Sequence, residues 1–415
     1  MAEQITFPKG FLWGVAGAGH QIEGNNVNSD GWLLEHVAGT PFREPSGDAC
    51  DHYHRYADDI ALIASLGFNS YRFSLEWARI EPEEGEFSTA MLEHYRRLLV
   101  ACHEHQLTPI VTYNHFTCPR WFGAKGGWEV AANAEYFARF CERATAYLGD
   151  LIGVACTLNE PNLGVMLQHM GIFPADEVIM KAPFRLAAAQ ACNSNVFSSY
   201  PQCCPQRVVR DTFIKAHRLG YNAIKAGRGD FPVGIALAMF DHQVVAGGEA
   251  LRDRIRHEVD DVFLDAVRDD DFIGVQTYSR TRYGAEGILP PEAGVELTQM
   301  HYEFWPEALE ATIRYAANYT GRPVLVTENG IGTSDDTRRV EFVRRALLGV
   351  ERCIQDGITV RGYCYWSVFD NYEWAMGYEP TFGLIAVDRA TQARTLKPSA
   401  NWLGNIARKN TLEET

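Results

Sequence analysis

The sequence predicts an α/β fold consisting of a single closed (β/α)8 barrel that spans residues 1–415. Two observations support this prediction. Short apolar runs typical of buried strands alternate with longer amphipathic stretches typical of helices. Eight such runs are present, which favours a closed barrel over an open sheet. Length alone would suggest two or three domains, but barrels of this type can exceed about 400 residues as one domain.

The predicted strands are short and mostly apolar. They are Leu12–Ala18, Ser70–Leu75, Pro109–Tyr113, Gly153–Thr157, Val233–Ala238, Phe272–Gln276, Val324–Thr327 and Val360–Tyr365. The stretches between them have helical periodicity. They are Tyr53–Leu66, Ala90–His105, Asn133–Leu148, Arg210–Ala226, Glu249–Ala266, Pro306–Tyr319 and Asp336–Gln355. Repeated units of this kind indicate a TIM barrel.

One long stretch, at about 163–206, fits neither pattern and is rich in Ser, Asn, Pro and Cys around residues 192–206. A loop of this length is usually functional or mobile. It follows the predicted strand Gly153–Thr157. We therefore expect it to lie over the face formed by the C-terminal strand ends, where the active sites of such barrels occur.

Composition and charge exclude several classes of protein. Hydrophobic residues make up 46% and charged residues 22%, as in a soluble globular protein. The net charge is 38 − 53 = −15, which disfavours nucleic acid and anionic membrane surfaces as partners. The stretch Met1–Gly10 lacks the pattern of a signal peptide, and no apolar window is long enough to cross a membrane. The expected location is the cytoplasm.

The ten cysteines suit a reducing compartment, because five of them fall within predicted strands or helices. Cys203 and Cys204 are adjacent, and Cys192 lies nearby. These three could be considered as metal ligands, but no complete four-ligand spacing is present. No metal and no cofactor is expected.

Two carboxylates follow buried strands and are the strongest functional signal. Glu160 stands in Thr157-Leu158-Asn159-Glu160-Pro161, and Glu328 stands in Thr327-Glu328-Asn329-Gly330. They are 328 − 160 = 168 residues apart. In a barrel their strand ends would nevertheless share one face, because all strands point the same way. A pair of facing carboxylates is what glycoside hydrolysis requires.

Other polar and aromatic residues occupy corresponding positions at strand ends. Gln21 follows the first strand, Arg72 interrupts the second, His115 follows the third and Tyr278 follows the sixth. Trp366 opens a further group after the eighth strand. A buried arginine must be paired, because an unpaired buried charge is costly. The clustering of such groups indicates a site more strongly than any one of them does.

Several motifs occur in an order that spans residues 11–388. They are Phe11-Leu12-Trp13-Gly14, Gln21-Ile22-Glu23-Gly24, Tyr71-Arg72-Phe73-Ser74, the two acidic motifs, Tyr365-Trp366-Ser367, Asp370-Asn371-Tyr372-Glu373-Trp374, Phe382-Gly383-Leu384 and Val387-Asp388. Together they resemble glycoside hydrolase family 1, the family of retaining β-glucosidases.

The resemblance implies that Glu160 is the general acid/base and Glu328 the nucleophile. A retaining mechanism places the two carboxyl groups about 5–5.5 Å apart. Arg72 and Tyr278 would lower the pKa of the nucleophile, because a cation and a hydrogen-bond donor favour the ionised form. Asn159 resembles the family's donor to the sugar 2-hydroxyl.

The resemblance also implies a sugar-binding set of polar and aromatic residues. Its members are Gln21, His115, Gln276, Tyr302, Trp366, Glu373, Trp374 and Phe382. A carboxylate such as Glu373 would repel a phosphate, and Pro380-Thr381 supplies no positive charge. A non-phosphorylated sugar is therefore expected.

The chain departs from the family pattern at a few positions. Phe116 and Asn162 stand where tryptophan is usual, Gln276 stands where asparagine is usual, and Tyr302 replaces a tryptophan on the leaving-group side. Most of these positions lie away from the expected sugar floor. They affect the expected leaving-group preference rather than the expected reaction.

The predicted function is that of a retaining exo-β-glycosidase that removes a terminal non-reducing β-linked sugar. The sugar is expected to be β-D-glucose, with some tolerance for galactose or fucose, and the partner to be a small β-glycoside or oligosaccharide. A transglycosidase with the same covalent intermediate and a non-catalytic sugar-binding barrel are the alternatives. Oligomeric state is left open, with a homo-oligomer among the alternatives.

Overall fold

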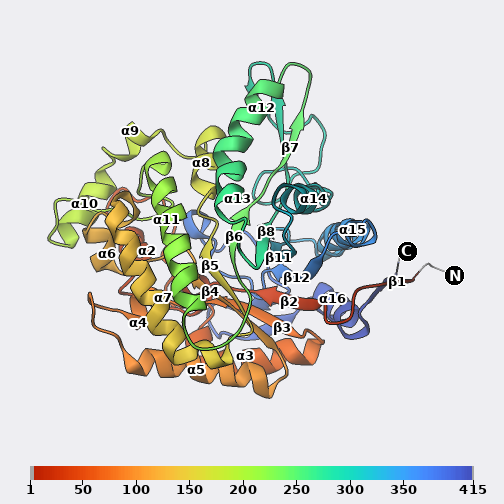
Figure 1. Cartoon of the computed structure of the whole chain (residues 1–415), viewed down its shortest axis with the longest axis horizontal. Coiled ribbons are helices and arrows are strands. Elements are labelled where there is room, and N and C mark those ends of the chain that lie inside the picture. Colours follow the sequence, from red (N-terminus) through yellow and green to blue (C-terminus); the bar gives the residue numbers. More distant parts are fainter. Residues whose placement is uncertain (1–3, 414–415) are drawn as a thin grey trace.

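The structure is a computed structural model that describes residues 4–413 and contains a closed barrel of eight parallel strands with helices around it (Figure 1). The barrel strands are β2 (Leu12–Ala16), β3 (Ser70–Ser74), β4 (Thr108–Asn114), β5 (Val154–Asn159), β6 (Val233–Ala238), β8 (Phe272–Gln276), β11 (Val324–Asn329) and β12 (Val360–Trp366). They follow chain order around the barrel, which closes between β12 and β2. The predicted fold class is confirmed.

All eight predicted strands are present, but four of them extend further than predicted. β4 continues through Asn114, β5 through Asn159, β11 through Asn329 and β12 through Trp366. Parallel pairing to the neighbouring strands continues over these ends, as between Asn329 and Tyr365. Apart from Leu158, the residues added at these ends are polar or aromatic, and they carry the motifs of the predicted site to the barrel rim.

The long helices agree with the helical periodicity of the sequence. They are α3 (His52–Leu66), α5 (Thr89–Glu104), α7 (Ala134–Leu148), α11 (Gln206–Lys225), α12 (Glu249–Arg256), α13 (Val262–Ala266), α14 (Ala308–Thr320) and α15 (Asp336–Gln355). Ser88 and Asp335 cap α5 and α15 by accepting a backbone N–H, and Gly67 ends α3 with φ +111°. The predicted helix Glu249–Ala266 is interrupted by a π-helical turn at His257–Asp261.

Shorter helices that periodicity did not predict occupy the connections. They are α1 (Gly19–Ile22), α2 (Asp30–Glu35), α4 (Trp77–Ile80), α6 (Arg120–Ala124), α8 (Leu163–His169), α9 (Asp176–Ile179), α10 (Pro183–Ala191) and α16 (Pro398–Lys409). Short 3-10 turns lie at Gly127–Glu129, Ala131–Asn133, Gly149–Leu151 and Trp374–Met376. Most are too short for a periodic signal to emerge.

The expected irregular stretch at 163–206 is only partly irregular. It contains α8, α9 and α10, which lie beyond the rim in Figure 1. The alanines of α10 and Pro183 at its first position favour helix, although polar residues surround them in the sequence.

Small sheets complete the fold outside the barrel. β1 (Gln4–Thr6) pairs with β15 (Thr411–Glu413), which brings the two ends of the chain together (Figure 1). β7 (Asp241–Val244), β9 (Arg280–Gly284) and β10 (Gly287–Ile288) form a three-stranded sheet, and β13 (Ile385–Val387) pairs with β14 (Arg394–Leu396).

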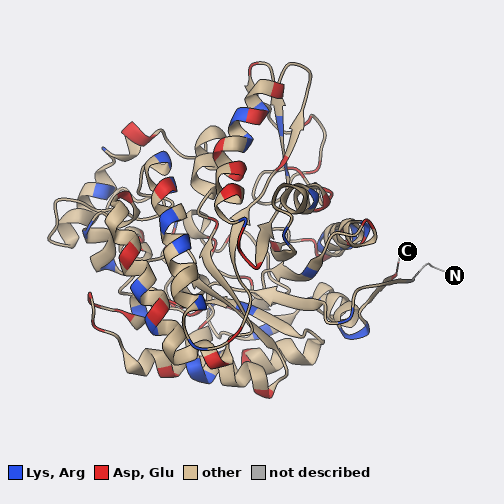
Figure 2. Cartoon of the chain, viewed as in Figure 1, with Lys and Arg blue, Asp and Glu red and all other residues tan. Residues whose placement is uncertain are grey.

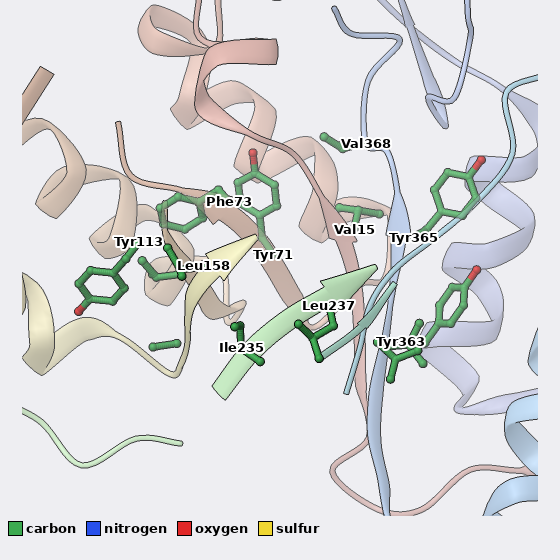
Figure 3. Packing of buried hydrophobic residues seen from close by; sticks show 14 of the residues in the cluster. Val15, Tyr71, Phe73, Tyr113, Leu158, Ile235, Leu237, Tyr363, Tyr365 and Val368 are labelled. Atoms are coloured by element: carbon green, nitrogen blue, oxygen red, sulfur yellow. The ribbon is translucent and has the colours of Figure 1, made fainter. Parts of the chain in front are cut away.

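Side chains alternate along the barrel strands between the interior and the helix layer. On β3, Tyr71 and Phe73 join a large apolar cluster that includes helix residues, whereas Arg72 points into the barrel. Figure 3 shows the same spacing of two residues for Ile235 and Leu237 on β6. This alternation directs one polar residue from several strands toward a common centre.

Charged residues belong mainly to the outer helices and loops (Figure 2). Within residues 4–413, no helix combines the length and apolarity needed to cross a membrane. All ten cysteines are free, and all of them except the partly exposed Cys192 are buried.

Candidate active site

The two predicted catalytic carboxylates lie at the C-terminal rim of the barrel, on two strands that β6 and β8 separate. Glu328 is the penultimate residue of β11, and Glu160 follows β5 directly. Both residues are buried, with 3% and 8% of their surfaces exposed. Glu160 has a left-handed backbone (φ +44°), and its N–H donates to the carbonyl of Ala236 at 2.8 Å. Such backbone strain in a non-glycine residue is typical of functional sites.

Two donors bind the Glu328 carboxyl group. Arg72 Nη1 lies 2.5 Å from Oε1, and the Tyr278 hydroxyl donates to Oε2 at 2.5 Å. Burial raises the pKa of Glu328, while the Arg72 charge and the Tyr278 hydrogen bond act in the opposite direction. The pKa of Glu328 is raised overall, but Arg72 and Tyr278 hold it lower than burial alone would.

Glu160 has a different environment. Burial raises the pKa of Glu160 well above its usual value, and the negative charge of Glu328 raises it further, with Arg72 opposing in part. A proton shared between the two carboxyl groups therefore resides on Glu160, because the cation and the phenol donor bind Glu328.

Asn159 connects the Glu328 site to its neighbours. Arg72 Nη2 and Gln276 Nε2 both donate to Asn159 Oδ1, at 2.6 and 2.9 Å. Because both donors converge on the oxygen, the Asn159 amide nitrogen must point the other way, where it lies 3.3 Å from His115 Nε2. Its orientation is thus determined by three buried neighbours.

Gln21, Trp366 and Glu373 form a second polar group on the rim. Trp366 Nε1 donates to Glu373 Oε1 at 3.3 Å, and Gln21 Nε2 lies 3.5 Å from the other carboxylate oxygen. Gln21 also donates to the Tyr372 carbonyl at 2.8 Å. Burial raises the pKa of Glu373 well above its usual value, and the charge of Glu328 adds to this effect.

Parallel aromatic rings line the same region. His115 stacks on Trp366 with 5.7 Å between ring centroids and on Trp374 with 6.4 Å. Phe116 contacts Trp374 edge-on at 5.2 Å. Burial and the Arg72 charge lower the pKa of His115 well below its usual value, so this imidazole is neutral.

Tyr278, Tyr302 and Phe382 lie on another side of the group. The Phe382 and Tyr278 rings meet edge-on, with centroids 6.0 Å apart. Burial raises the pKa of the Tyr302 phenol, and the charges of Glu373 and Glu160 raise it further, which places Tyr302 near both carboxyl groups.

Several buried polar atoms of this group have no hydrogen-bond partner among the described residues. They are Gln21 Oε1, His115 Nδ1, Gln276 Oε1 and Asn371 Nδ2. Leaving such groups unsatisfied costs about 1–3 kcal/mol each. The arrangement therefore has unused donors and acceptors for the hydroxyl groups of a ligand.

The structure thus brings together the predicted site residues, which come from seven barrel strands or the segments after them.

Two other residues of the sequence motifs, or next to them, make contacts outside this group. Asn162 is fully buried and donates to the carbonyls of Ala238 and Val259, at 2.6 and 3.2 Å. Glu23 pairs with Arg79 at 2.8 Å. Asn162, expected to influence the leaving group, instead joins β6 to the π-helical turn.

Two residues that no sequence motif indicated also contact this group. The Tyr200 hydroxyl donates to the Glu160 carbonyl at 2.7 Å, and the His20 ring stacks on Trp374 at 5.4 Å. Tyr200 lies in a polar stretch without periodicity, so no local signal marks it. His20 directly precedes Gln21, which was the available clue.

Within residues 4–413, no group of three or more His, Cys, Asp or Glu side chains has the arrangement of a metal site. Cys203 and Cys204 are buried, and burial raises the thiol pKa of both. These thiols are protonated and chemically inert at neutral pH.

A closed β/α barrel with two buried carboxyl groups at its C-terminal strand ends defines the glycoside hydrolase class of enzyme. The sequence profile of glycosyl hydrolase family 1 matches residues 3–222 and 267–412. The chain belongs to glycosyl hydrolase family 1. It is accordingly a β-glucosidase-like hydrolase of a retaining family, which confirms the predicted family and enzyme class.

Individual relatives cover nearly the whole chain. The 1,4-β-D-glucan glucohydrolase of Thermotoga neapolitana is 31% identical, over 98% of this chain and 99% of the relative. A bifunctional β-D-glucosidase/β-D-fucosidase of Bifidobacterium breve is 30% identical, over 96% and 97%. Among solved structures, the β-glycosidase BGL167 is 56% identical with a TM-score of 0.94, covering 99% of each chain.

Proposed function

We propose that this enzyme hydrolyses terminal non-reducing β-linked sugars by double displacement, with Glu328 as nucleophile and Glu160 as general acid/base. The unequal surroundings of the two carboxyl groups are the observation that carries this assignment. Arg72 and Tyr278 both bind Glu328, each at 2.5 Å, whereas the Glu328 charge raises the pKa of Glu160.

In the first step, a Glu328 oxygen attacks the anomeric carbon while Glu160 gives its proton to the departing glycosidic oxygen. The glycosidic bond breaks, and an ester between the sugar and Glu328 forms. The leaving group departs as a neutral alcohol. Burial supports this step because it keeps Glu160 protonated at neutral pH.

In the second step, water replaces the leaving group. Esterification removes the negative charge of Glu328, so Glu160 can then ionise and accept a proton from the attacking water. Water forms a bond to the anomeric carbon, the ester breaks, and Glu328 is released as a carboxylate. Each step inverts the anomeric carbon, so the overall configuration is retained. Neither step requires a metal ion or an organic cofactor.

The sugar itself would be held by the unpartnered polar atoms of the rim and by the aromatic rings. Gln21, His115 and Glu373 suit the outer hydroxyl groups, and the Asn159 amide suits the 2-hydroxyl beside the reacting carbon. The ring faces of Trp366 and Trp374 suit the C–H face of a sugar.

The proposed glycone is non-phosphorylated β-D-glucose, with galactose or fucose accepted less well. Glu373 supports a neutral sugar, because a carboxylate repels phosphate. The names of the relatives, a β-D-glucan glucohydrolase and a β-D-glucosidase/β-D-fucosidase, support glucose and fucose. Tyr302 and Phe382 would border the bound sugar and its leaving group.

We also propose that residues 1–415 act as one glycosidase domain with the segment 163–206 over the active-site face. The hydrogen bond from Tyr200 to the Glu160 carbonyl supports this arrangement. The buried free thiols support a cytoplasmic location.

Two measurements test the proposal. Glu328→Gln removes the nucleophile while keeping its shape, and we expect activity on an aryl β-glucoside to fall at least about 10³-fold. Glu23→Gln serves as a matched control, because Glu23 is a buried carboxylate that pairs with Arg79 outside the site. NMR of the first product should show the β-anomer. An α-anomer as first product would refute the double displacement.

A panel of aryl β-glycosides that differ only in their sugar would test the glycone. The prediction is that the glucoside has the highest kcat/KM, with the fucoside and galactoside next. A preference for a 6-phosphorylated sugar would contradict the role of Glu373. Product analysis with excess alcohol would measure how much of the intermediate is transferred rather than hydrolysed.

A further inference from the structure

Behind the proposed sugar site lies a buried ionisable network that the two-step mechanism does not use. His20 is 1% exposed, and its Nε2 lies 2.7 Å from Glu35 Oε1. Glu35 in turn accepts from the backbone N–H and the hydroxyl of Ser46, both at 2.8 Å. Glu35, itself fixed by Ser46, thus holds the imidazole at its Nε2 atom.

The His20 ring faces the sugar site indirectly, through Trp374. The two rings are nearly parallel, with an interplanar angle of 6° and centroids 5.4 Å apart. Trp374 has a left-handed backbone (φ +53°) and lies in a short 3-10 turn, so its own segment fixes it weakly. The imidazole therefore supplies a flat support for the indole, on which His115 also stacks, at 6.4 Å.

Glu76 joins this network to the segment that carries His115. One Glu76 oxygen accepts the backbone N–H of His20 at 2.9 Å, directly before Gln21. The other accepts the Thr117 hydroxyl at 2.9 Å, two residues after His115, and the Asn26 amide at 2.6 Å. One carboxyl group thus fixes the backbone beside two proposed sugar ligands.

Two glycines leave the space that this network needs. A side chain at Gly19 would come within 2.6 Å of Glu76, and one at Gly31 would come within 3.3 Å of the His20 ring. Both approaches are closer than ordinary van der Waals contact, so neither site tolerates a larger residue without displacing the network.

The charged groups that face His20 are carboxyl groups, and its Nδ1 atom lies 3.3 Å from the Asn26 amide nitrogen. Burial lowers its pKa, but the hydrogen bond to Glu35 and the charges of Glu35, Glu76 and Asp30 outweigh burial and raise the pKa overall. Burial raises the pKa of both Glu76 and Asp30 to about 7. Besides these carboxyl groups, the Tyr372 ring faces His20 edge-on at 6.1 Å.

We propose that His20 and Glu76 are positioning residues for the sugar site: His20, anchored by Glu35, supports Trp374, and Glu76 fixes the segments that carry Gln21 and His115. This inference rests on the proposed assignment of those three residues to the sugar. It adds a second layer that determines glycone affinity without touching the sugar or the reacting atoms.

The test separates binding from chemistry. His20→Ala should raise KM for an aryl β-glucoside about tenfold and raise the inhibition constant of glucose in parallel, with kcat changed less than about threefold. His20→Phe restores a flat ring against Trp374 and should recover most of the loss. Glu76→Gln keeps its volume but replaces an acceptor by a donor toward Thr117 and Asn26, and it should also raise KM.

His52 provides a matched control, because it is a buried histidine (1% exposed) whose Nδ1 lies 2.8 Å from the carboxylate of Asp59. It contacts none of the proposed sugar ligands directly, so His52→Ala should lower the melting temperature without raising KM. An equal rise of KM in His52→Ala would overturn the inference, and so would an unchanged KM in both His20→Ala and Glu76→Gln.

Loss of activity in Glu328→Gln tests the proposed chemistry separately, so either proposal can fail without the other.

Discussion

Arg72 and Glu328 form a fully buried ion pair although 256 positions separate them in the chain. Arg72 Nη1 lies 2.5 Å from Glu328 Oε1, and their side chains are 1% and 5% exposed. The same guanidinium group also binds Asn159. A single cation therefore links the proposed nucleophile to the segment that carries the proposed acid, across the interior of the barrel.

Replacing Arg72 by methionine should damage both stability and catalysis. Glu328 would become a buried charge without its cation, which costs about 3–5 kcal/mol unless the carboxyl group takes up a proton. A protonated Glu328 cannot attack, so kcat/KM at neutral pH should fall at least about 10²-fold. Thermal unfolding and aryl β-glucoside kinetics measure the two effects. Arg72→Lys should recover only part of each, because lysine cannot reproduce the two-pronged geometry.

Tyr278→Phe removes only the hydrogen bond to Glu328 Oε2. That bond favours the ionised carboxylate, so its loss should raise the pKa of Glu328. The acidic limb of the kcat/KM profile should then move to higher pH, with the largest loss of activity at low pH. A profile of unchanged shape would show that the phenol does not stabilise the carboxylate. Tyr113→Phe is a control, because Tyr113 binds Thr145 in the core instead.

Glu160→Ala should affect the two steps differently. For an aryl glycoside with a good leaving group, the first step needs little protonation, so the ester should accumulate and give a burst of released phenol. Azide, which needs no base to attack, should then restore turnover and yield a β-glycosyl azide. An unreactive variant that azide does not rescue would argue against the acid/base role.

The alkaline limb of activity follows from the same residue. Because the pKa of Glu160 is raised, the enzyme holds the required proton at neutral pH and loses it as the pH rises through that pKa. The limb should therefore disappear in Glu160→Gln, whatever activity remains.

Tyr200→Phe tests the attachment of the segment 163–206. The Tyr200 hydroxyl donates to the Glu160 carbonyl at 2.7 Å and accepts the Gly164 N–H at 3.0 Å. Its removal leaves the buried Gly164 N–H without its acceptor, while the Glu160 carbonyl keeps the Leu163 N–H at 3.1 Å, and the loss should cost about 1–3 kcal/mol of stability. We expect faster proteolysis within 163–206 and a several-fold lower kcat. Stability and cleavage equal to those of the parent would show that this bond does not hold the segment.

The eight barrel strands could be predicted because each is a short apolar run between amphipathic helices. The short helices α8, α9 and α10 could not, because each is too short to show a periodic pattern and depends on its neighbours for stability. The polar ends of β5, β11 and β12 were missed for a related reason. Parallel pairing extends those strands over residues whose own preferences do not indicate a strand.

Among the site residues, those in sequence motifs were predictable and those outside them were not. Glu160, Glu328 and Arg72 stand in motifs, whereas Tyr200 stands in a stretch without a recognisable pattern. Asn162, noted as a departure from the family pattern, has a structural role that the sequence did not indicate. Its amide binds two backbone carbonyls of other segments.

The sequence by itself determined the family, the barrel and the two carboxylates that define the reaction, because motif order and apolar periodicity are properties of the linear chain. Only the tertiary structure decided which partner each carboxyl group has and hence how their proton affinities differ. It also decided that His20 stacks on Trp374 and that Glu76 accepts the His20 backbone N–H, the contacts on which the proposed support of the sugar site rests. Proton affinity and side-chain support depend on neighbours brought close by folding, and burial makes those neighbours' charges and hydrogen bonds strong.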